Sequence, residues 1–291
     1  MSFPIMEVRD EDFPSLLREI PQVPQQLNYR GQLPTADMKL LAVVGSRKYS
    51  TYGKQVIEYL ISGLKGFNVG IISGLALGVD SLAHEAALRH NLYTLAVPGS
   101  GIDDNVIYPA RHKGLAQQIL ENNGGLLSEF EPTFTATKWS FTQRNRIMAG
   151  MTHATLMIEA TEKSGTLITA RMATDYNREL LVVPGNIFSG NCAGTHQFLK
   201  LGATPITHAH DILYTLGIDP EQKSQEATLF GTLSPLSTAE EKVLQILHEP
   251  TDTDTLIRAV DLLPHEANVL LMQMEMKGLI ASEGNIYRRN I

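Results

Sequence analysis

Between residues 39 and 216, short continuous apolar runs alternate with stretches that place apolar residues at helical spacing. The apolar runs are LLAVVG (40–45), FNVGIISG (67–74), YTLAVPGSG (93–101), LLSEF (126–130), ATLMIEA (154–160) and LLVVPG (180–185). The helical stretches are 52–65, 78–90, 110–123 and 164–177. Runs without polar alternation are typical of parallel strands, which are buried on both faces. The pattern therefore predicts an α/β fold, in which helices cover both faces of a parallel sheet.

The rest of the 291-residue chain divides around this main domain of residues 39–216. Residues 1–38 predict a short N-terminal extension that packs on the main domain. Residues 217–235 lose all periodicity and predict a linker. Residues 236–291 hold three amphipathic helical patterns, and the sequence ASEGNIYRRN that follows them suggests a hairpin-like wing. This order of elements predicts a small winged-helix domain.

Composition narrows the class of protein. Hydrophobic residues make up 43% of the chain, enough to bury a sizeable core. The N-terminus lacks the basic segment and apolar run of a signal peptide, and no stretch reaches the roughly 18 apolar residues that a membrane helix needs. The single cysteine, Cys192, cannot form an internal disulfide, which fits a reducing compartment. We therefore expect a cytoplasmic protein.

Glycine-rich turns follow most of the predicted strands. They are 44–53, 72–80, 98–103, 159–170 and 184–195. The carboxyl ends of parallel strands meet at one edge of the sheet, where free backbone N–H groups and helix N-termini bind phosphates. The first turn carries Gly45, Ser46 and Arg47 in place of a dinucleotide fingerprint, and the chain has no P-loop. The sequence thus predicts a phosphate-bearing ligand, and neither NAD, ATP nor any other cofactor or metal.

The segment 132–158 combines cations with aromatic rings. It has no Asp or Glu and a net charge of +3, in a chain whose net charge is −7. The residues in question are Lys138, Arg144, Arg146, Phe134, Trp139 and Phe141. Single-stranded nucleic acid is held by such a combination, because cations follow the backbone while rings stack on unpaired bases. Of these residues, Trp139 is better explained as a core or interface residue.

Spaced motifs across residues 29–210 resemble the DprA/Smf family. The matching segments are YRG (29–31), VGSR (44–47), TYG (51–53), ISGLALGVDSLAHEAAL (72–88), YP (108–109), LLSEF (126–130), QRNRIMAG (143–150), EATEKSGTLITARMA (159–173), VPGN (183–186) and GA (202–203). The resemblance implies an extended Rossmann-like domain that binds single-stranded DNA in a positive pocket. It also implies a homodimer that protects incoming DNA and helps load the RecA recombinase during natural transformation. Many family members carry a helical N-terminal domain, for which residues 1–38 are too short.

The resemblance also implies which residues bind DNA. The family's G-S-R turn corresponds to Gly45, Ser46 and Arg47, and its Lys-x-x-Phe pattern to Lys138 and Phe141. The other residues expected at the site are Arg144, Arg146, Ser73, Gly74, Ser164, Gly165 and Thr166. The implied mechanism is positional, with no catalytic residues: the turns hold phosphates while Phe141 stacks a base.

Two other functions stay open at this point. The first is a nucleotide hydrolase that resembles the lysine-decarboxylase-like phosphoribohydrolases, whose layout is related. The segment 162–169 keeps the Ser-Gly-Thr of their signature but places Thr169 where the catalytic Glu would stand, which removes the obvious acid/base group. The second is a nucleotide sensor, which would bind mononucleotides tightly and be indifferent to strand length. We expect no enzyme.

The charge of the C-terminal domain argues against a duplex-DNA reader. Residues 236–291 carry five basic and nine acidic residues, a net charge of −4. The candidate recognition helix, about 264–278, presents Glu266 and Asn268 early and has no Arg or Lys before Lys277. Binding by counterion release needs cations that face the phosphates. We expect weak duplex binding or none, and a role in protein interaction or regulation.

Overall fold

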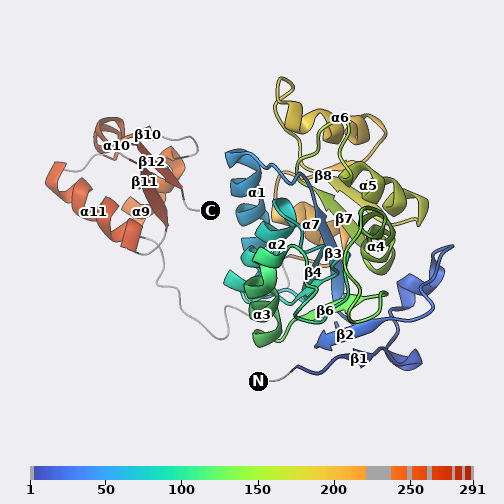
Figure 1. Cartoon of the computed structure of the whole chain (residues 1–291). Helices are drawn as coiled ribbons and strands as arrows, with labels where there is room; N and C mark the ends of the chain where they lie inside the picture. Colours follow the sequence, from blue (N-terminus) through green and yellow to red (C-terminus); the bar gives the residue numbers. More distant parts are fainter. Residues whose placement is uncertain are drawn as a thin grey trace. The chain divides into compact units, whose positions relative to one another are not determined.

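The computed structural model describes residues 3–220, 237–247, 251–260, 264–276, 279–283 and 286–289 (Figure 1). The chain divides into two compact units, Met1–Glu221 and Gln222–Ile291. The predicted linker, 217–235, falls mostly outside the described residues. Among those that are described, no helix is long and apolar enough to cross a membrane.

Residues 3–220 contain a nine-stranded sheet in the order β1-β2-β6-β5-β4-β3-β7-β8-β9. The seven strands that run from β6 to β9 in this order are parallel to one another, as the apolar runs predict, whereas β2 pairs antiparallel with both β6 and β1 at one edge. The strands are β1 (Met6–Glu7), β2 (Asn28–Gly31), β3 (Lys39–Val44), β4 (Val69–Ser73), β5 (Thr94–Ala96), β6 (Gly125–Ser128), β7 (Ala154–Met157), β8 (Glu179–Val182) and β9 (Thr204–Pro205). The N-terminal residues thus extend the sheet through β2, which pairs with β6.

Helices cover both faces of this sheet (Figure 1). One face carries α1 (Thr51–Ser62), α2 (Val79–Arg89), α3 (Lys113–Glu121) and α7 (Ala209–Thr215), and the other carries α4 (Lys138–Met151), α5 (Thr166–Asp175) and α6 (Ala193–Lys200). Side chains of β3 alternate between the two faces: Leu41 and Val43 pack under α1 and α2, and Leu40 and Val44 pack under α4. Short 3-10 helices occupy Asp10–Asp12, Ser15–Glu19, Ala110–His112 and Gly190–Cys192.

Helix α4 lies in the basic segment, where the apolar pattern predicted no helix. Its N-terminus is fixed by a capping box, in which the Thr137 side chain accepts from the backbone N–H of Ser140 and the Ser140 side chain accepts from that of Thr137. Every residue from Arg146 to Met151 is buried, so this half of α4 shows no one-sided apolar stripe. A helix buried on all sides escapes a search for amphipathic periodicity. Helices α6 and α7 were also missed, and both are short.

The described part of the C-terminal unit has the predicted winged-helix elements. Its helices are α9 (Thr238–Ile246), α10 (Thr253–Ala259) and α11 (Pro264–Met276), and its strands are β10 (Thr251–Asp252), β11 (Ile280–Glu283) and β12 (Ile286–Arg289). The antiparallel pair β11–β12 confirms the predicted wing. The unit has a core of its own, which includes Val243, Leu247, Leu256, Leu271 and Met274.

Candidate nucleic-acid interface

A cavity of about 640 Å³ lies at the carboxyl ends of the parallel strands. Its walls come from the end of β3, the turn after β4, the loop after β5, helix α4 and the start of α5. Strand order reverses between β3 and β7, because β4 and β5 lie on one side of β3 while β7 and β8 lie on the other. Such a switch point opens a crevice at the carboxyl edge, which is where open α/β sheets bind ligands. The fold itself therefore creates this cavity.

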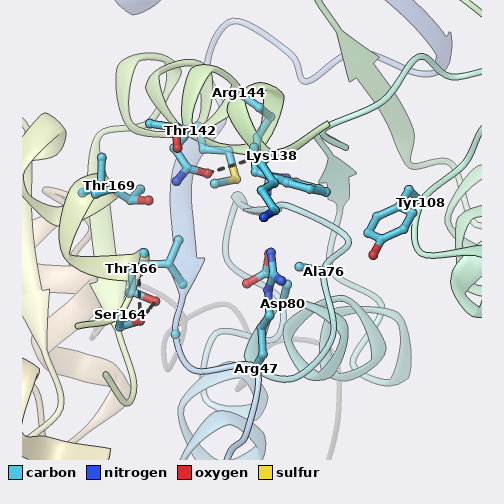
Figure 2. A pocket seen from close by; sticks show the side chains of 17 residues that line it. Arg47, Ala76, Asp80, Tyr108, Lys138, Thr142, Arg144, Ser164, Thr166 and Thr169 are labelled. Atoms are coloured by element: carbon cyan, nitrogen blue, oxygen red, sulfur yellow. Dashed lines mark hydrogen bonds between the residues drawn. The ribbon is translucent and has the colours of Figure 1, made fainter. Parts of the chain in front are cut away.

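Two cations meet across the cavity. Arg47 rises from the turn after β3 and Lys138 descends from the first turn of α4, so that their side chains point toward one another (Figure 2). Both residues are exposed, and neither forms an ion pair with any residue in the described parts of the chain. Two unpaired cations facing a shared space attract an anion such as a backbone phosphate.

An aromatic surface lies beside these cations. The Arg47 guanidinium is 5.4 Å from the centroid of the Phe141 ring, and the Tyr108 ring is 5.5 Å from it, centroid to centroid. Tyr108 is half exposed and its hydroxyl points toward the cavity (Figure 2). Phe141 packs on Gly99, where a Cβ would lie 2.5 Å from the ring. The two rings form a wall on which a base can stack.

One face of α4 supplies most of that wall. The lining residues Lys138, Phe141, Thr142, Asn145 and Met148 recur at the three- and four-residue spacing of one helical face. Arg146 lies on the opposite side of the helix, where its buried guanidinium pairs with Glu129. Arg144 and Arg146, which are two residues apart in the sequence, therefore lie on different sides of α4.

Arg144 lies beneath the cavity floor and is almost fully buried. It donates to the carbonyl oxygens of Gly74 (2.6 Å) and Val97, and to the side chain of Asn145 (3.1 Å). Burial lowers the pKa of Arg144 to about 10, an effect that the nearby Asp80 carboxylate opposes. Burial likewise raises the pKa of Asp80, against the charges of Arg144 and Arg47 and the hydrogen bond from the Gly74 N–H (3.1 Å). Arg144 therefore supports the floor of the cavity through its hydrogen bonds, and its positive charge lies beneath the cavity surface.

The turn after β3 is fixed by its backbone. The Ser46 N–H donates to the carbonyl of Glu159 (2.7 Å), and the Ser46 carbonyl accepts from the N–H of Val79 (3.1 Å). A Cβ on Gly45 would lie 2.6 Å from the Val79 side chain, so the close packing of this turn on α2 requires glycine. Ser46 itself is buried, and its hydroxyl bonds the backbone of Lys48. These hydrogen bonds and the packing on α2 hold the turn, which presents Arg47 to the cavity.

The start of α5 closes the opposite side of the cavity. Ser164, Gly165 and Thr166 line it, and the hydroxyls of Ser164 and Thr166 bond each other at 2.9 Å (Figure 2). Gly165 has open space around its Cα, with no atom within 4 Å of a Cβ position. The backbone N–H groups of Thr166, Leu167 and Ile168 already donate to Ser164 and Gly165. What this side offers a phosphate is therefore the two hydroxyls and the positive end of the α5 helix dipole.

The structure brings eight of the twelve predicted site residues to the cavity wall. They are Gly45, Arg47, Lys138, Phe141, Arg144, Ser164, Gly165 and Thr166. Ser46, Ser73, Gly74 and Arg146 do not line it. Ser73 is fully buried, with its hydroxyl on the carbonyl of Val43 (2.7 Å), and Gly74 lies behind Arg144. Trp139 also lies outside the cavity, half exposed and packed edge-on against Phe130 and Phe134.

Tyr108 and Asp80 are lining residues that sequence reasoning did not assign to the site. Tyr108 belongs to the YP motif, which was noted without a role, and only the folded loop after β5 brings it to Phe141. Asp80 lies in the first turn of α2, where a carboxylate is common because it interacts favourably with the helix N-terminus, so the sequence gives no sign of a site there. Its burial next to Arg144 is a tertiary property.

Comparison with known proteins shows which family has this architecture. The family model described as DNA recombination-mediator protein A matches residues 4–217, and that of the DprA winged helix domain matches residues 230–285. This chain belongs to the DprA/Smf family. DNA processing protein DprA of Streptococcus pneumoniae is 39% identical over 211 residues, which cover 72% of this chain and 73% of that protein. Protein Smf of Escherichia coli is 39% identical over 206 residues, which cover 71% of this chain and 54% of that protein.

Solved structures of DprA share the fold. The X-ray structure of the Streptococcus pneumoniae protein matches with a TM-score of 0.67 and 37% identity, over 74% of each chain. The DprA of Helicobacter pylori matches with a TM-score of 0.66 and 30% identity, over 74% of this chain and 96% of that one. The Helicobacter pylori structure is described as showing a single-stranded-DNA binding mode. The expected Rossmann-like layout with a winged-helix domain is therefore confirmed.

Proposed function

We propose that this DprA/Smf protein binds single-stranded DNA in the cavity at the carboxyl edge of its sheet. The observation that carries the proposal is the convergence of Arg47, Lys138 and the Phe141–Tyr108 wall on one cavity. Phosphates lie between Arg47 and Lys138 and against the Ser164–Thr166 turn, while a base stacks on Phe141. The Helicobacter pylori relative, whose structure is described as showing a single-stranded-DNA binding mode, supports the same ligand.

Selectivity for single strands follows from the geometry. The aromatic wall lies within a cavity, beside the cations rather than on a flat surface. A base reaches it only when it is unpaired and turned away from its neighbours, as bases in a single strand are free to do. In a duplex, pairing and stacking hold the bases inside the helix, so only the phosphates remain to be bound. We expect much weaker binding of the duplex.

The proposed mechanism is positional, and the protein is not an enzyme in this proposal. Among the lining residues, all of which the structure describes, Asp80 is the only carboxylate. It accepts from the Gly74 N–H and lies beneath the surface next to Arg144. Thr169 lines the cavity at the position where the hydrolase signature has Glu. A nucleotide hydrolase stays the alternative, and release of free base from nucleoside monophosphates would establish it.

We further propose that the protein acts in the cytoplasm as a homodimer that protects incoming DNA and helps load RecA in natural transformation. Membership of a family described as recombination mediators supports a role of this kind. Two copies would offer two cavities to one strand and hold it extended. Co-sedimentation of the protein with RecA on a single strand, and a dimer mass in light scattering, test these two points.

We propose a protein-interaction or regulatory role for the winged-helix unit. The described residues of α11 include no Arg or Lys, and Val269 and Met272 are exposed on it. An apolar and acidic helix surface suits a protein partner better than a duplex. Micromolar or tighter duplex binding by the isolated fragment 236–291 at physiological salt would overturn this role.

The first experiment is fluorescence anisotropy across a salt series. A labelled strand of about 30 nucleotides and its duplex are titrated with the wild type and with Arg47→Ala/Lys138→Ala. We expect strand-selective binding that the double variant loses, with a log–log salt slope of about −0.7 per phosphate neutralised. Equal affinity for strand and duplex, or an unaffected variant, would contradict the proposal. Tight mononucleotide binding without dependence on strand length would favour a nucleotide sensor.

A further inference from the structure

The loop after β8 exposes two adjacent large apolar side chains. Phe188 is 91% exposed and Ile187 is 78% exposed. The Asn186 side chain accepts from the N–H of Phe188 (2.8 Å), and its carbonyl accepts from that of Ser189 (3.0 Å), so a local turn presents both side chains at the tip. Single exposed apolar residues are common, but Ile187 and Phe188 are neighbours on one turn and together form a contiguous exposed apolar surface.

This loop is fastened to the rim of the DNA-binding cavity. The Asn191 side chain donates to the carbonyl of Lys48 (3.3 Å), next to the turn that carries Arg47. The Asn191 carbonyl accepts from the N–H of Ala160 (2.7 Å), at the start of the turn that leads to Ser164. At the other end of the loop, the Tyr52 hydroxyl donates to the carbonyl of Pro184 (2.6 Å). The loop that carries Phe188 is therefore fastened at its Asn191 end to both of the turns whose other residues, Arg47 and Ser164, line the cavity.

The turns that link the cavity to this loop carry cations and an accessible backbone. Lys48 and Lys163 are exposed, and neither pairs with a carboxylate of the residues that the structure describes. Next to Lys163, the open space at Gly165 allows a strand to approach the backbone. Glu162 is the exposed carboxylate of the same turn. With two lysines and one exposed carboxylate between them, the two turns carry a net positive charge, which favours the binding of phosphates.

We infer that the bound strand leaves the cavity over the turn after β7 and stacks a further base on Phe188, with Ile187 beside it. This inference rests on the proposed function, because it extends the same strand past Ser164 and Gly165. The occupant is single-stranded DNA because the exposed ring continues the order of cations and aromatic rings that begins inside the cavity. Phe188 thus lengthens the binding site and favours strands longer than the cavity alone can hold.

The test compares strand lengths. Phe188→Ala, Phe188→Tyr and Tyr214→Ala are titrated with oligothymidylates of about 4 and about 20 nucleotides. Tyr214 is the matched control because it is also an exposed aromatic residue, with 62% of its surface accessible. It lies near the end of α7, the helix that follows β9 and packs against α1. We expect Phe188→Ala to weaken the long strand by about 5- to 150-fold, as loss of one stacked base does, and to leave the short strand unchanged. Phe188→Tyr retains the ring and should bind as the wild type does.

The outcomes separate this inference from the proposed function. If Arg47→Ala/Lys138→Ala loses both strands while Phe188→Ala binds both normally, the cavity function stands and the inference is wrong. Equal weakening of short and long strands by Phe188→Ala would also overturn it, because Phe188 would then act on the cavity. A change in oligomer mass with unchanged DNA affinity would assign the loop to a protein contact instead. If the wild type binds neither strand, the proposed function itself fails.

Discussion

The guanidinium of Arg144 donates to the carbonyl of Gly74 at 2.6 Å and fills the space where any larger residue would place its Cβ. That Cβ would lie 2.1 Å from Nη1 of Arg144. The absence of a side chain at Gly74 is what lets the arginine reach beneath the cavity floor. The relationship couples the turn after β4 to helix α4, and its disruption has measurable consequences.

Gly74→Ala should destabilise the protein. The added methyl group must displace a buried guanidinium, and overpacking of this kind costs about 1–3 kcal/mol of the free energy of unfolding. Urea denaturation at neutral pH measures the loss. Gly165→Ala is the matched control, since its Cβ meets nothing within 4 Å, and it should unfold like the wild type. Equal stability of the two variants would show that Arg144 relocates without cost.

Arg146→Ala should lower the stability of the protein, whereas Arg47→Ala should weaken strand binding alone. Arg146 pairs with Glu129, both nearly buried, and removal of one partner leaves a buried charge, which costs about 3–5 kcal/mol of stability. Arg47 is exposed, so Arg47→Ala should leave stability unchanged and reduce the log–log salt slope of strand binding by about 0.7. Urea denaturation and anisotropy across salt measure the two effects. The double swap Arg146→Met/Glu129→Leu should recover stability, and a salt slope altered by Arg146→Ala in the folded protein would contradict this division.

Phe141→Leu should weaken strand binding with little change in folding. Leucine keeps most of the apolar contact with Gly99 but cannot stack a base, and one lost stack costs about 1–3 kcal/mol of binding free energy. Tyr108→Leu tests the second ring of the wall in the same way. A double-mutant cycle by anisotropy then measures their coupling, which we expect because the ring centroids are 5.5 Å apart. Unchanged affinity in both single variants would remove the aromatic wall from the site.

Stability should fall in mild acid because of His84. This residue is fully buried on α2, with Nδ1 2.8 Å from the Thr94 hydroxyl, and burial lowers the pKa of His84 to about 3. An unfolded histidine titrates near pH 6.5, so between these two values the unfolded state binds the extra proton. The free energy of unfolding therefore decreases as pH falls below 6.5, by up to about 1.4 kcal/mol per pH unit from this group.

His84→Gln isolates this contribution, because glutamine can bond Thr94 but does not titrate. The loss of stability between pH 7 and pH 5, measured by urea denaturation, should be about 2 kcal/mol smaller in the variant than in the wild type. An identical loss in both proteins would mean that His84 is hydrated or protonated in the fold.

The sequence by itself determined the class of fold and the edge of the sheet that carries the site. Apolar runs without polar alternation can be buried only on both faces, which requires helices on both sides of a parallel sheet. Glycine-rich turns at the ends of those runs must then gather at one edge, which made Arg47 a candidate, and the basic segment 132–158 contributed Lys138. The family resemblance added Phe141 as the stacking residue.

Only the tertiary structure decided which neighbours in the sequence share a site. Arg144 and Arg146 are two residues apart, which on a helix turns them about 200° from each other, so one braces the cavity and the other pairs with Glu129. The apolar pattern could not reveal this, because α4 is buried on all sides in its second half and shows no one-sided stripe. Tyr108 reached the site through a loop far from α4 in sequence. Such contacts depend on how packed elements approach one another in space, and a local sequence pattern does not predict that approach.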